Sequence, residues 1–282
     1  MSKQRTYDRV TLLGVEVDVI TLAEATNYLI ATAADPRTPA GYVIKPYVEF
    51  LDRASTNPKL AALLNDAELS VADGVAVVWA AHYLYAGPRT LARFLLTLSQ
   101  IIAAPAELCW PLPERAAGTN FTWQLLRTAA EKQLRVALIG KETAADIGVV
   151  ASTITAALPS ITIVSTIPGR DPNAPRGHVT PSWTDATARQ LLETKPDLIL
   201  VGMGFPLQEH VCADLVTRLP HGLLIGEGGT FDYESFGGPK RKAPPAIQRI
   251  GLEWLWRLAL EPTRLRRQFA IPRFIAKVRR TH

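Results

Sequence analysis

Short apolar runs and longer helical patterns alternate along the second half of the chain, from about residue 119 onward. Each run is short enough for a buried strand, and each precedes or follows a segment whose apolar residues have helical spacing. The runs cover residues 135–139, 160–167, 197–201 and 222–225, and the helical segments cover 120–133, 144–158, 184–194 and 208–219. Alternation of this kind predicts a parallel sheet with helices on both faces. The expected fold class is therefore α/β, with a mostly parallel Rossmann-like sheet.

The first third of the chain is less regular but still predicts definite elements. Residues 9–20 alternate between apolar and polar positions around Gly14, which predicts a hairpin. Thr21 followed by Glu24 is a capping box, so a helix is expected to run to about residue 33. The pattern then predicts strands at 42–45 and 69–72, a helix at 48–64 that can break at Asn57-Pro58, and a helix at 75–85.

Residues 86–113 have a role that the pattern leaves open. Residues 91–104 are mostly apolar with helical spacing, and prolines follow at positions 105, 111 and 113. One interpretation is an insertion or lid within an α/β domain that spans residues 1–243. The other is a hydrophobic surface that meets a membrane or another subunit, since exposed apolar patches mark such contacts. Assembly into a homo-oligomer is therefore one expectation for this chain.

Residues 244–282 are expected to form a second region, a basic and amphipathic C-terminal helical appendage. The whole chain carries a net charge of +5, and positive charge collects after Pro239, where basic residues far outnumber acidic ones. Such a segment attracts phosphates, anionic lipid or nucleic acid. Nucleic acid is disfavoured as a partner because the chain contains no recognisable DNA- or RNA-binding motif.

The spacing within this appendage favours a membrane surface. Three arginines fall near one helical face, and aromatic residues accompany them. The arginines are Arg257, Arg264 and Arg267, and the apolar residues include Trp254, Phe269, Phe274 and Ile275. Basic residues with interfacial aromatics are typical of a helix that lies on a membrane. The alternative is an ordinary C-terminal helix that docks its apolar face on the domain.

The composition is that of an ordinary globular protein. The chain has 282 residues, of which 48% are hydrophobic and 20% charged. No apolar run is long enough for a transmembrane helix, and the polar N-terminus lacks the apolar segment of a signal peptide. Cys109 and Cys212 are the only cysteines, so neither a disulfide scaffold nor a thiolate zinc site is expected. The cytosol is the expected compartment.

Three predicted strands run into glycine-rich turns, which are the first candidates for chemistry. The turns are Gly140-Lys141, Gly202-x-Gly204 and Gly226-x-Gly228. At the C-terminal edge of a parallel sheet, glycines let backbone N–H groups approach a phosphate. A pyrophosphate or nucleotide site is the favoured interpretation, and the alternative is that the glycines only make tight turns. The chain contains neither GxGxxG followed by an acidic residue nor a P-loop, which disfavours dinucleotide-dependent oxidoreductases and P-loop NTPases.

Two aspartates are candidates for catalysis and binding. Asp73 follows an apolar strand and precedes Gly74, so it can act as a general base on a hydroxyl or cap the next helix. Asp232 can bind a ribose or a base edge, or cap a turn. The five histidines show no metal-ligand spacing and no DxD motif occurs, so neither a metal nor another cofactor is expected. An enzyme without a metal must neutralise a leaving diphosphate with Arg, Lys and backbone N–H groups.

Several strings in the chain resemble the WecG/TagA/CpsF family of glycosyltransferases. The resemblance spans roughly residues 10–270 and is most specific in the second half of the chain. The strings there are Pro196–Glu209, Gly228–Asp232, Arg241–Pro244, Gly251–Leu258 and Glu261–Arg264. Earlier, Ala72–Gly74 resembles the family's Pro-Asp-Gly, and Glu114–Asn120 resembles its Glu-Arg-Val-x-Gly-Ser/Thr-Asp.

The resemblance implies a bacterial enzyme that moves an N-acetylmannosamine-type or related sugar from a UDP donor to a polyprenyl-diphosphate-linked sugar. The implied reaction is metal-independent and inverting, and it serves cell-surface polysaccharide or teichoic acid synthesis at the cytoplasmic face of the membrane. Asp73 matches the catalytic base, Arg115 and Gln208 match the active-site pocket, and Asp232 matches a nucleotide contact. The C-terminal arginines match an appendage that closes over the site at the membrane. Further positions expected to bind substrate are Gly74, Gly118, Asn120, Gly140, Gly202, Gly204, Glu209 and Gly228.

The chain departs from the family pattern near the expected site. Lys45 and Tyr47 stand where the family usually has Thr-x-Asn, and Glu227 lies in a turn that is usually uncharged. Leu207 replaces the usual Lys of Pro-Lys-Gln-Glu. Lys45 can pair with a diphosphate or an acidic sugar, so both Lys45 and Tyr47 are expected to bind substrate. The same departures also fit a different donor, or a non-catalytic relative that binds a nucleotide sugar.

Overall fold

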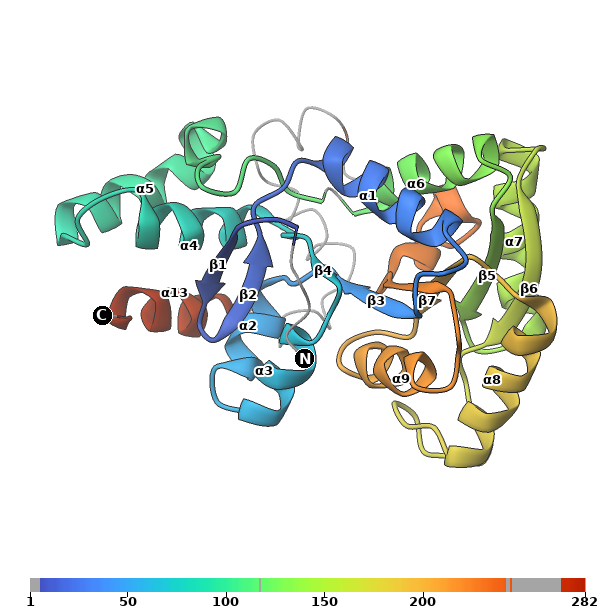
Figure 1. Cartoon of the computed structure of the whole chain (residues 1–282). Helices are drawn as coiled ribbons and strands as arrows, with labels where there is room; N and C mark the ends of the chain where they lie inside the picture. The colour runs from blue at the N-terminus through green and yellow to red at the C-terminus, as the bar shows by residue number, and fades with distance from the viewer. Residues whose placement is uncertain (1–5, 117, 242–243, 245–269, 282) are drawn as a thin grey trace.

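The computed structural model describes residues 6–116, 118–241, 244 and 270–281. A six-stranded sheet has the order β4-β3-β8-β7-β5-β6, and every neighbouring pair in it is parallel (Figure 1). The strands are β3 (Gly41–Ile44), β4 (Leu69–Ser70), β5 (Arg135–Gly140), β6 (Thr162–Pro168), β7 (Leu198–Gly202) and β8 (Leu223–Gly226). The predicted parallel α/β fold is confirmed.

Apart from Arg135 at the start of β5, the central strands are apolar because both faces of the sheet are covered. Along β5, Val136 and Leu138 belong to one hydrophobic core, whereas Ala137 and Ile139 belong to another. Successive side chains of a strand point to opposite faces, so this alternation assigns one core to each side of the sheet.

Helices complete the two cores. The core that contains Ala137 also takes side chains from α2 (Val48–Ala54), α3 (Pro58–Asn65), α4 (Val75–Tyr85), α8 (Pro181–Thr194) and α9 (Leu207–Val216). The core that contains Val136 takes them from α1 (Leu22–Ala34), α6 (Thr119–Glu131) and α7 (Ala144–Ala157). The expected arrangement of helices on both faces is therefore confirmed.

A separate two-stranded hairpin begins the chain, as the alternation around Gly14 predicted. β1 (Arg9–Leu12) pairs antiparallel with β2 (Val15–Asp18). Leu13 and Gly14 both have positive φ, at 51° and 87°, which is the backbone that a two-residue hairpin turn requires. The capping box that begins α1 is also present, because Thr21 Oγ1 accepts from the Glu24 N–H and the Glu24 carboxylate accepts from the Thr21 N–H.

The helix predicted at 48–64 is two helices, and the break is at the predicted Asn57-Pro58. Asn57 caps α3, since its side-chain oxygen accepts a hydrogen bond from the Leu60 N–H at 3.1 Å. Pro58 occupies the first position of α3, where its missing N–H costs nothing. Asn57 and Pro58 therefore separate α2 from α3 and begin the second helix.

Residues 91–108 form a helical pair on the outer side of α4. α5 (Leu91–Ala103) begins after Thr90, whose side chain accepts from the Arg93 N–H, and the short 3₁₀ helix η1 (Pro105–Leu108) follows it. In Figure 1, α4, α5 and α13 (Ala270–Arg280) lie together at the end of the molecule that is far from β6. The helix predicted at 91–104 is thus confirmed.

α13 is the described part of the basic C-terminal appendage, and it docks on α2 and α4. Phe274 is fully buried, with its ring 6.4 Å from that of Trp79. Asp52 of α2 is buried and accepts from Arg273 Nη2 at 3.0 Å and from Lys277 Nζ at 2.7 Å. The expectation that Phe274 faces a membrane is therefore wrong, because an aromatic side chain that fills the core has no surface left for lipid. Residues 245–269 lie outside the described residues.

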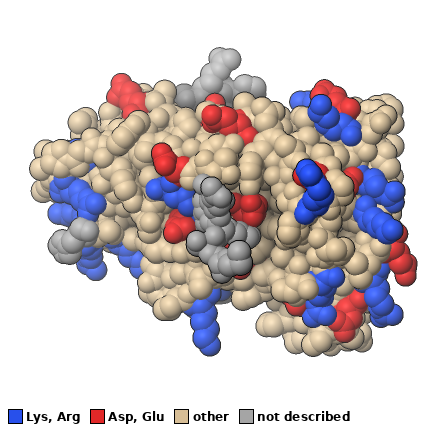
Figure 2. Space-filling view, in the orientation of Figure 1, with Lys and Arg blue, Asp and Glu red and all other residues tan. Residues whose placement is uncertain are grey.

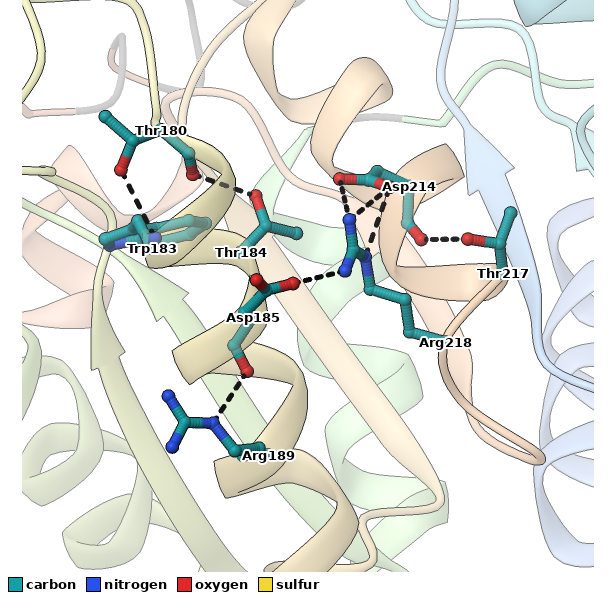
Figure 3. A network of polar contacts seen from close by, with 8 residues as sticks. All are labelled: Thr180, Trp183, Thr184, Asp185, Arg189, Asp214, Thr217 and Arg218. Atoms are coloured by element: carbon teal, nitrogen blue, oxygen red, sulfur yellow. Dashed lines mark hydrogen bonds and ion pairs between the residues drawn. The ribbon is translucent and has the colours of Figure 1, made fainter.

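A polar network joins α8 to the end of α9, on the same side of the sheet as α2 and α4 (Figure 3). Arg218 forms ion pairs with Asp185 of α8 and with Asp214 of α9, the latter at 3.1 Å. Thr180 caps α8 by accepting from the Trp183 N–H at 3.3 Å. These side chains are partly exposed, so the network orients two neighbouring helices more than it adds stability.

Within the described parts of the chain, no helix has both the length and the apolar character needed to cross a membrane.

Candidate active site

The loops that follow the parallel strands meet at one edge of the sheet. The strand order reverses between β5 and β7, because the chain leaves β5 for β6 on one side and leaves β7 for β8 on the other. Ligands of open α/β sheets bind outside the carboxyl ends of the strands, at such a reversal. The candidate residues follow the strands one after another along this edge.

Asp73 lies just beyond β4 and close to the loop that follows β3. Its backbone N–H donates to the carbonyl oxygen of Pro46 at 2.9 Å, and its side chain is half-buried. Gly74, with φ +90°, occupies the N-cap position of α4. Asp73 therefore precedes the cap position, and the alternative interpretation of Asp73 as the helix cap is wrong.

Arg115 is brought to the same place by the segment that precedes α6. The Ala116 N–H donates to the Ala72 carbonyl oxygen at 2.7 Å, so Arg115 lies beside the residue that precedes Asp73. Arg115 is exposed, and it makes no hydrogen bond or ion pair within the described residues. Gly118 then turns the chain into α6 with φ +41°, and Asn120 is exposed in the first turn of that helix.

Lys45 and Glu227, two departures from the family pattern, bind each other. Lys45 follows β3 and Glu227 follows β8, and these strands are neighbours. Lys45 Nζ lies 2.6 Å from Glu227 Oε2, and the two side chains are only 7% and 0% exposed. Thr122 of α6 donates its hydroxyl to the same carboxylate oxygen at 2.6 Å. Each charge therefore balances the other in the interior.

Gln208 joins two of the glycine-rich turns. Its Oε1 accepts from the Gly204 N–H at 3.2 Å and from the Gly228 N–H at 2.8 Å. Gly204 and Gly228 have φ values of +78° and +57°, and a Cβ at either position would meet open space. Their positive φ angles therefore explain why these two positions are glycine. Both N–H groups donate to the Gln208 side chain.

Gly140 and Gly202 have a different explanation. A Cβ at Gly140 would lie 2.7 Å from the Gly202 carbonyl oxygen, and one at Gly202 would lie 2.6 Å from Cδ2 of Phe231. Phe231 belongs to the 3₁₀ helix η2 (Thr230–Asp232), which packs over the ends of β5 and β7. Close packing alone thus accounts for these two glycines, without any contact to a phosphate.

Asp232 is held between two lysines. Its Oδ1 lies 3.0 Å from Lys141 Nζ, and its Oδ2 lies 3.0 Å from Lys240 Nζ. Burial acts to raise the pKa of Asp232, but the hydrogen bonds and charges of Lys240 and Lys141 outweigh it and lower that pKa below its usual value. Asp232 therefore brings two ammonium groups together beside the end of β5.

Lys141, Lys240 and Thr122 were not identified as site residues from the sequence. A signal for Lys141 was present, because it directly follows Gly140 at the end of a predicted strand. Lys240 and Thr122 give no such signal, since a charged residue in a basic tail and a threonine in a helix are both common on protein surfaces.

Tyr47 packs beside the turn that follows β7. Its ring lies 4.9 Å from that of Phe50 and 6.5 Å from that of Phe205, measured between centroids. Phe50 and Phe205 stack on each other at 3.9 Å, and the Arg53 guanidinium lies 5.0 Å from the Phe205 ring. Tyr47 therefore contacts the Gly204-Phe205 turn through its ring, which places it at the same edge of the sheet as the other candidate residues.

Glu209 follows Gln208 and fixes the orientation of its amide. Gln208 Nε2 donates to Glu209 Oε1 at 2.7 Å, while Glu209 Oε2 is buried without a hydrogen-bond partner in the described structure. Burial raises the pKa of Glu209 to about 7, and the hydrogen bond from Gln208 opposes this shift. Glu209 is thus a carboxyl group that changes charge near neutral pH in the folded protein.

The raised pKa of Glu209 predicts a pH-dependent stability. Between its usual pKa of 4.5 and about 7, folded Glu209 keeps a proton that the unfolded chain releases, so stability falls as pH rises through this window. At about 1.4 kcal/mol per pKa unit, the loss amounts to about 3 kcal/mol above pH 7. We expect Glu209→Gln to remove this loss, so that the variant is more stable than the wild type at about pH 8 but similar at about pH 5. Urea unfolding at both pH values measures it.

The control for this prediction is Glu193→Gln, because Glu193 is exposed on α8. This variant should show the same pH dependence as the wild type. A difference between Glu209→Gln and the wild type that stays constant with pH would contradict the prediction.

The described residues therefore gather most of the expected site at one sheet edge. Backbone hydrogen bonds link Asp73 and Arg115 to the loop that holds Lys45, and Gln208 links the turns after β7 and β8. The expected substrate-binding residues Arg257, Arg264 and Arg267 lie outside the described residues.

The parallel α/β sheet carries an aspartate, an exposed arginine, two lysines and glycine-rich turns at its carboxyl edge, which is the edge where open α/β sheets bind their ligands. The chain belongs to the Glycosyl transferase WecG/TagA/CpsF family, whose model matches residues 10–94 and 91–282. It is therefore a glycosyltransferase of a family that acts in cell-surface polysaccharide synthesis, and the family implies a nucleotide-sugar donor and a sugar acceptor.

Proposed function

We propose that this glycosyltransferase moves an N-acetylmannosamine-type or related sugar from a UDP donor to a polyprenyl-diphosphate-linked sugar. The observation that supports it best is the pairing of Asp73 with the Arg115 segment at the carboxyl edge of the sheet, through the Ala116 N–H and the Ala72 carbonyl oxygen. Such a transfer needs a base that accepts a proton and a cation that stabilises a leaving diphosphate, and this contact brings the segments that carry Asp73 and Arg115 to the same strand end.

In the proposed reaction, the acceptor hydroxyl attacks the anomeric carbon of the donor sugar. The new carbon–oxygen bond forms as the bond between the sugar and the diphosphate breaks, and UDP leaves with the bonding electron pair. Asp73 takes the proton of the hydroxyl. Attack from the side opposite UDP inverts the configuration, and the positively charged side chains neutralise the leaving group without a metal ion.

The charges that would stabilise the diphosphate come from several elements. Arg115 is exposed beside the end of β4, and Lys141 and Lys240 flank Asp232 beside the end of β5. In the proposal Asp232 contacts the nucleotide, and Arg257, Arg264 and Arg267 of the C-terminal region act near the membrane-linked acceptor. The enzyme would then work as a peripheral protein at the cytoplasmic face of the membrane.

The test is UDP release with membrane-extracted polyprenyl-diphosphate sugars as acceptors. Four donors form the panel: UDP-N-acetylmannosamine, its uronic acid, UDP-N-acetylglucosamine and UDP-glucose. We expect turnover with one of the first two, and no turnover without acceptor. Release with UDP-glucose alone would overturn the proposed donor class but keep the enzyme class.

One observation favours a second candidate, a non-catalytic relative that binds a nucleotide sugar. Lys45, at a position that resemblance assigns to substrate, is bound to Glu227 and buried. UDP binding by calorimetry, with no release from any donor of the panel, would favour this candidate over the enzyme.

A further inference from the structure

The exposed face of α5 is apolar and carries no charge. Eight large apolar side chains are exposed among the described residues, and six of them lie between Tyr85 and Trp110. On α5 they are Leu91, Leu95, Leu96 and Ile102, which are 54%, 57%, 59% and 60% exposed. Ala92, Ser99 and Ala103 complete this face. A contiguous apolar patch on a protein surface marks a contact with another protein or with a membrane.

The orientation of α5 is fixed by its opposite side. Phe94 and Thr97 are buried against α4, where Trp79 Nε1 donates to Thr97 Oγ1 at 3.1 Å. The Phe94 ring also packs edge-on against those of Trp79 and Tyr83. One side of α5 is thus packed on the protein. Leu91, Leu95 and Leu96 lie on its other side and face solvent.

Four arginines flank the N-terminal end of this face. Arg89 donates to the carbonyl oxygens of Leu84 and Thr281, and Arg93 donates to three carbonyl oxygens at the end of α4. The Arg279 guanidinium lies 5.3 Å from the Phe94 ring, and Arg280 is exposed beside it in sequence.

These arginines retain their positive charge without a counter-ion. Their partners are neutral carbonyl oxygens and an aromatic ring, and none forms an ion pair with a carboxylate within the described residues. Figure 2 shows basic side chains over the C-terminal end of α13, next to a largely uncharged surface over α4 and α5. The cluster therefore complements a negatively charged partner.

We propose that the apolar face of α5 and the arginines beside it form a docking surface for an anionic lipid bilayer. The leucines would enter the interface between headgroups and acyl chains, and the arginines would bind headgroup phosphates. Trp110 is 56% exposed at the other end of the segment, and tryptophan favours this interface. The inference extends the peripheral membrane location of the proposed function by naming the surface that binds, and its test needs neither a particular donor nor turnover.

The arginines also explain why lipid fits this face better than a second copy of the chain. A symmetric pair uses the same patch on both copies. A second copy docked with its α5 parallel to the first would bring two cationic clusters close together, and like charges across an interface are costly. A bilayer with anionic headgroups instead neutralises them.

The test is co-sedimentation of the full chain with two kinds of vesicle, phosphatidylcholine alone and phosphatidylcholine with phosphatidylglycerol. We expect the wild type to bind the second kind more tightly, and Leu95→Gln/Leu96→Gln to weaken that binding by roughly tenfold or more. Arg279→Gln/Arg280→Gln should also weaken binding to the anionic vesicles by roughly tenfold, and it should change binding to the neutral ones little.

The matched control is Val149→Gln/Leu192→Gln, which removes two exposed apolar side chains from α7 and α8. It should bind like the wild type. Unchanged binding of Leu95→Gln/Leu96→Gln would overturn the proposal and assign any membrane contact to another part of the chain. A wild-type dimer that this variant converts to a monomer, with vesicle binding unchanged, would instead identify a subunit interface. Because no substrate is present, an enzyme that fails every donor can still pass this test.

Discussion

We expect the Asp73→Asn variant to release UDP about 10²–10⁴-fold more slowly than the wild type, the range that one positioned general base contributes. Asparagine keeps the size of the side chain but cannot accept the proton of an attacking hydroxyl. Asp73 lies three residues after β4, and its backbone N–H is bound to the Pro46 carbonyl oxygen, a contact that asparagine keeps. The measurement is the rate of UDP release at saturating donor and acceptor.

Asp66→Asn is the matched control, because the same change is made at the opposite edge of the sheet. Asp66 is exposed and precedes β4, whereas Asp73 follows it. Asp66→Asn should keep the wild-type rate. UDP binding by calorimetry separates the two roles of Asp73: a base leaves UDP binding nearly unchanged, whereas a parallel loss of binding and rate would show that Asp73 holds the nucleotide or the local fold.

The elements that the sequence predicted correctly are those with a strong local signal. β5 and β7 are apolar runs between helical segments, and such runs are typical of strands buried on both faces. The capping box at Thr21 depends on residues three positions apart, and the helix break depends on the adjacent Asn57-Pro58, so both could be identified from the sequence. The approach of Asp73 to the strand edge follows from its place after β4.

The contacts that could not be predicted join residues that are far apart in sequence. Glu227 and Lys45 are separated by 182 positions, and their pairing depends on β3 and β8 being neighbours. Gly140 and Gly202 resemble phosphate-binding turns in sequence, but close packing against the Gly202 carbonyl oxygen and against the Phe231 ring, respectively, explains them. The residues around Phe274 have the composition of a helix that lies on a membrane. Only the contact with Trp79 shows that Phe274 faces the core. The local sequence pattern determines the helices and strands, whereas packing between distant residues determines what these side chains contact.

The buried pair of Lys45 and Glu227 predicts a large loss of stability when either partner is removed. We expect Glu227→Gln and Lys45→Met each to lower the free energy of unfolding by about 3–5 kcal/mol, because each leaves the other charge buried and unpaired. The double variant should lose less than the sum of the two, since it removes both charges together. Urea unfolding of the wild type, the two single variants and the double variant measures the coupling. The exposed pair of Arg37 and Asp35 is the control, and Arg37→Met/Asp35→Asn should change stability little.

The same double variant also tests what Lys45 does in the site. Glu227 Oε1 is buried and has no hydrogen-bond partner in the described structure, so the pair is not fully satisfied by its surroundings. Because Lys45 is proposed to bind substrate, we expect the double variant to recover stability but to release UDP slowly, with weaker binding of the donor. Recovery of both stability and rate would show that Lys45 only balances Glu227, and that the two departures from the family pattern offset each other without changing the reaction.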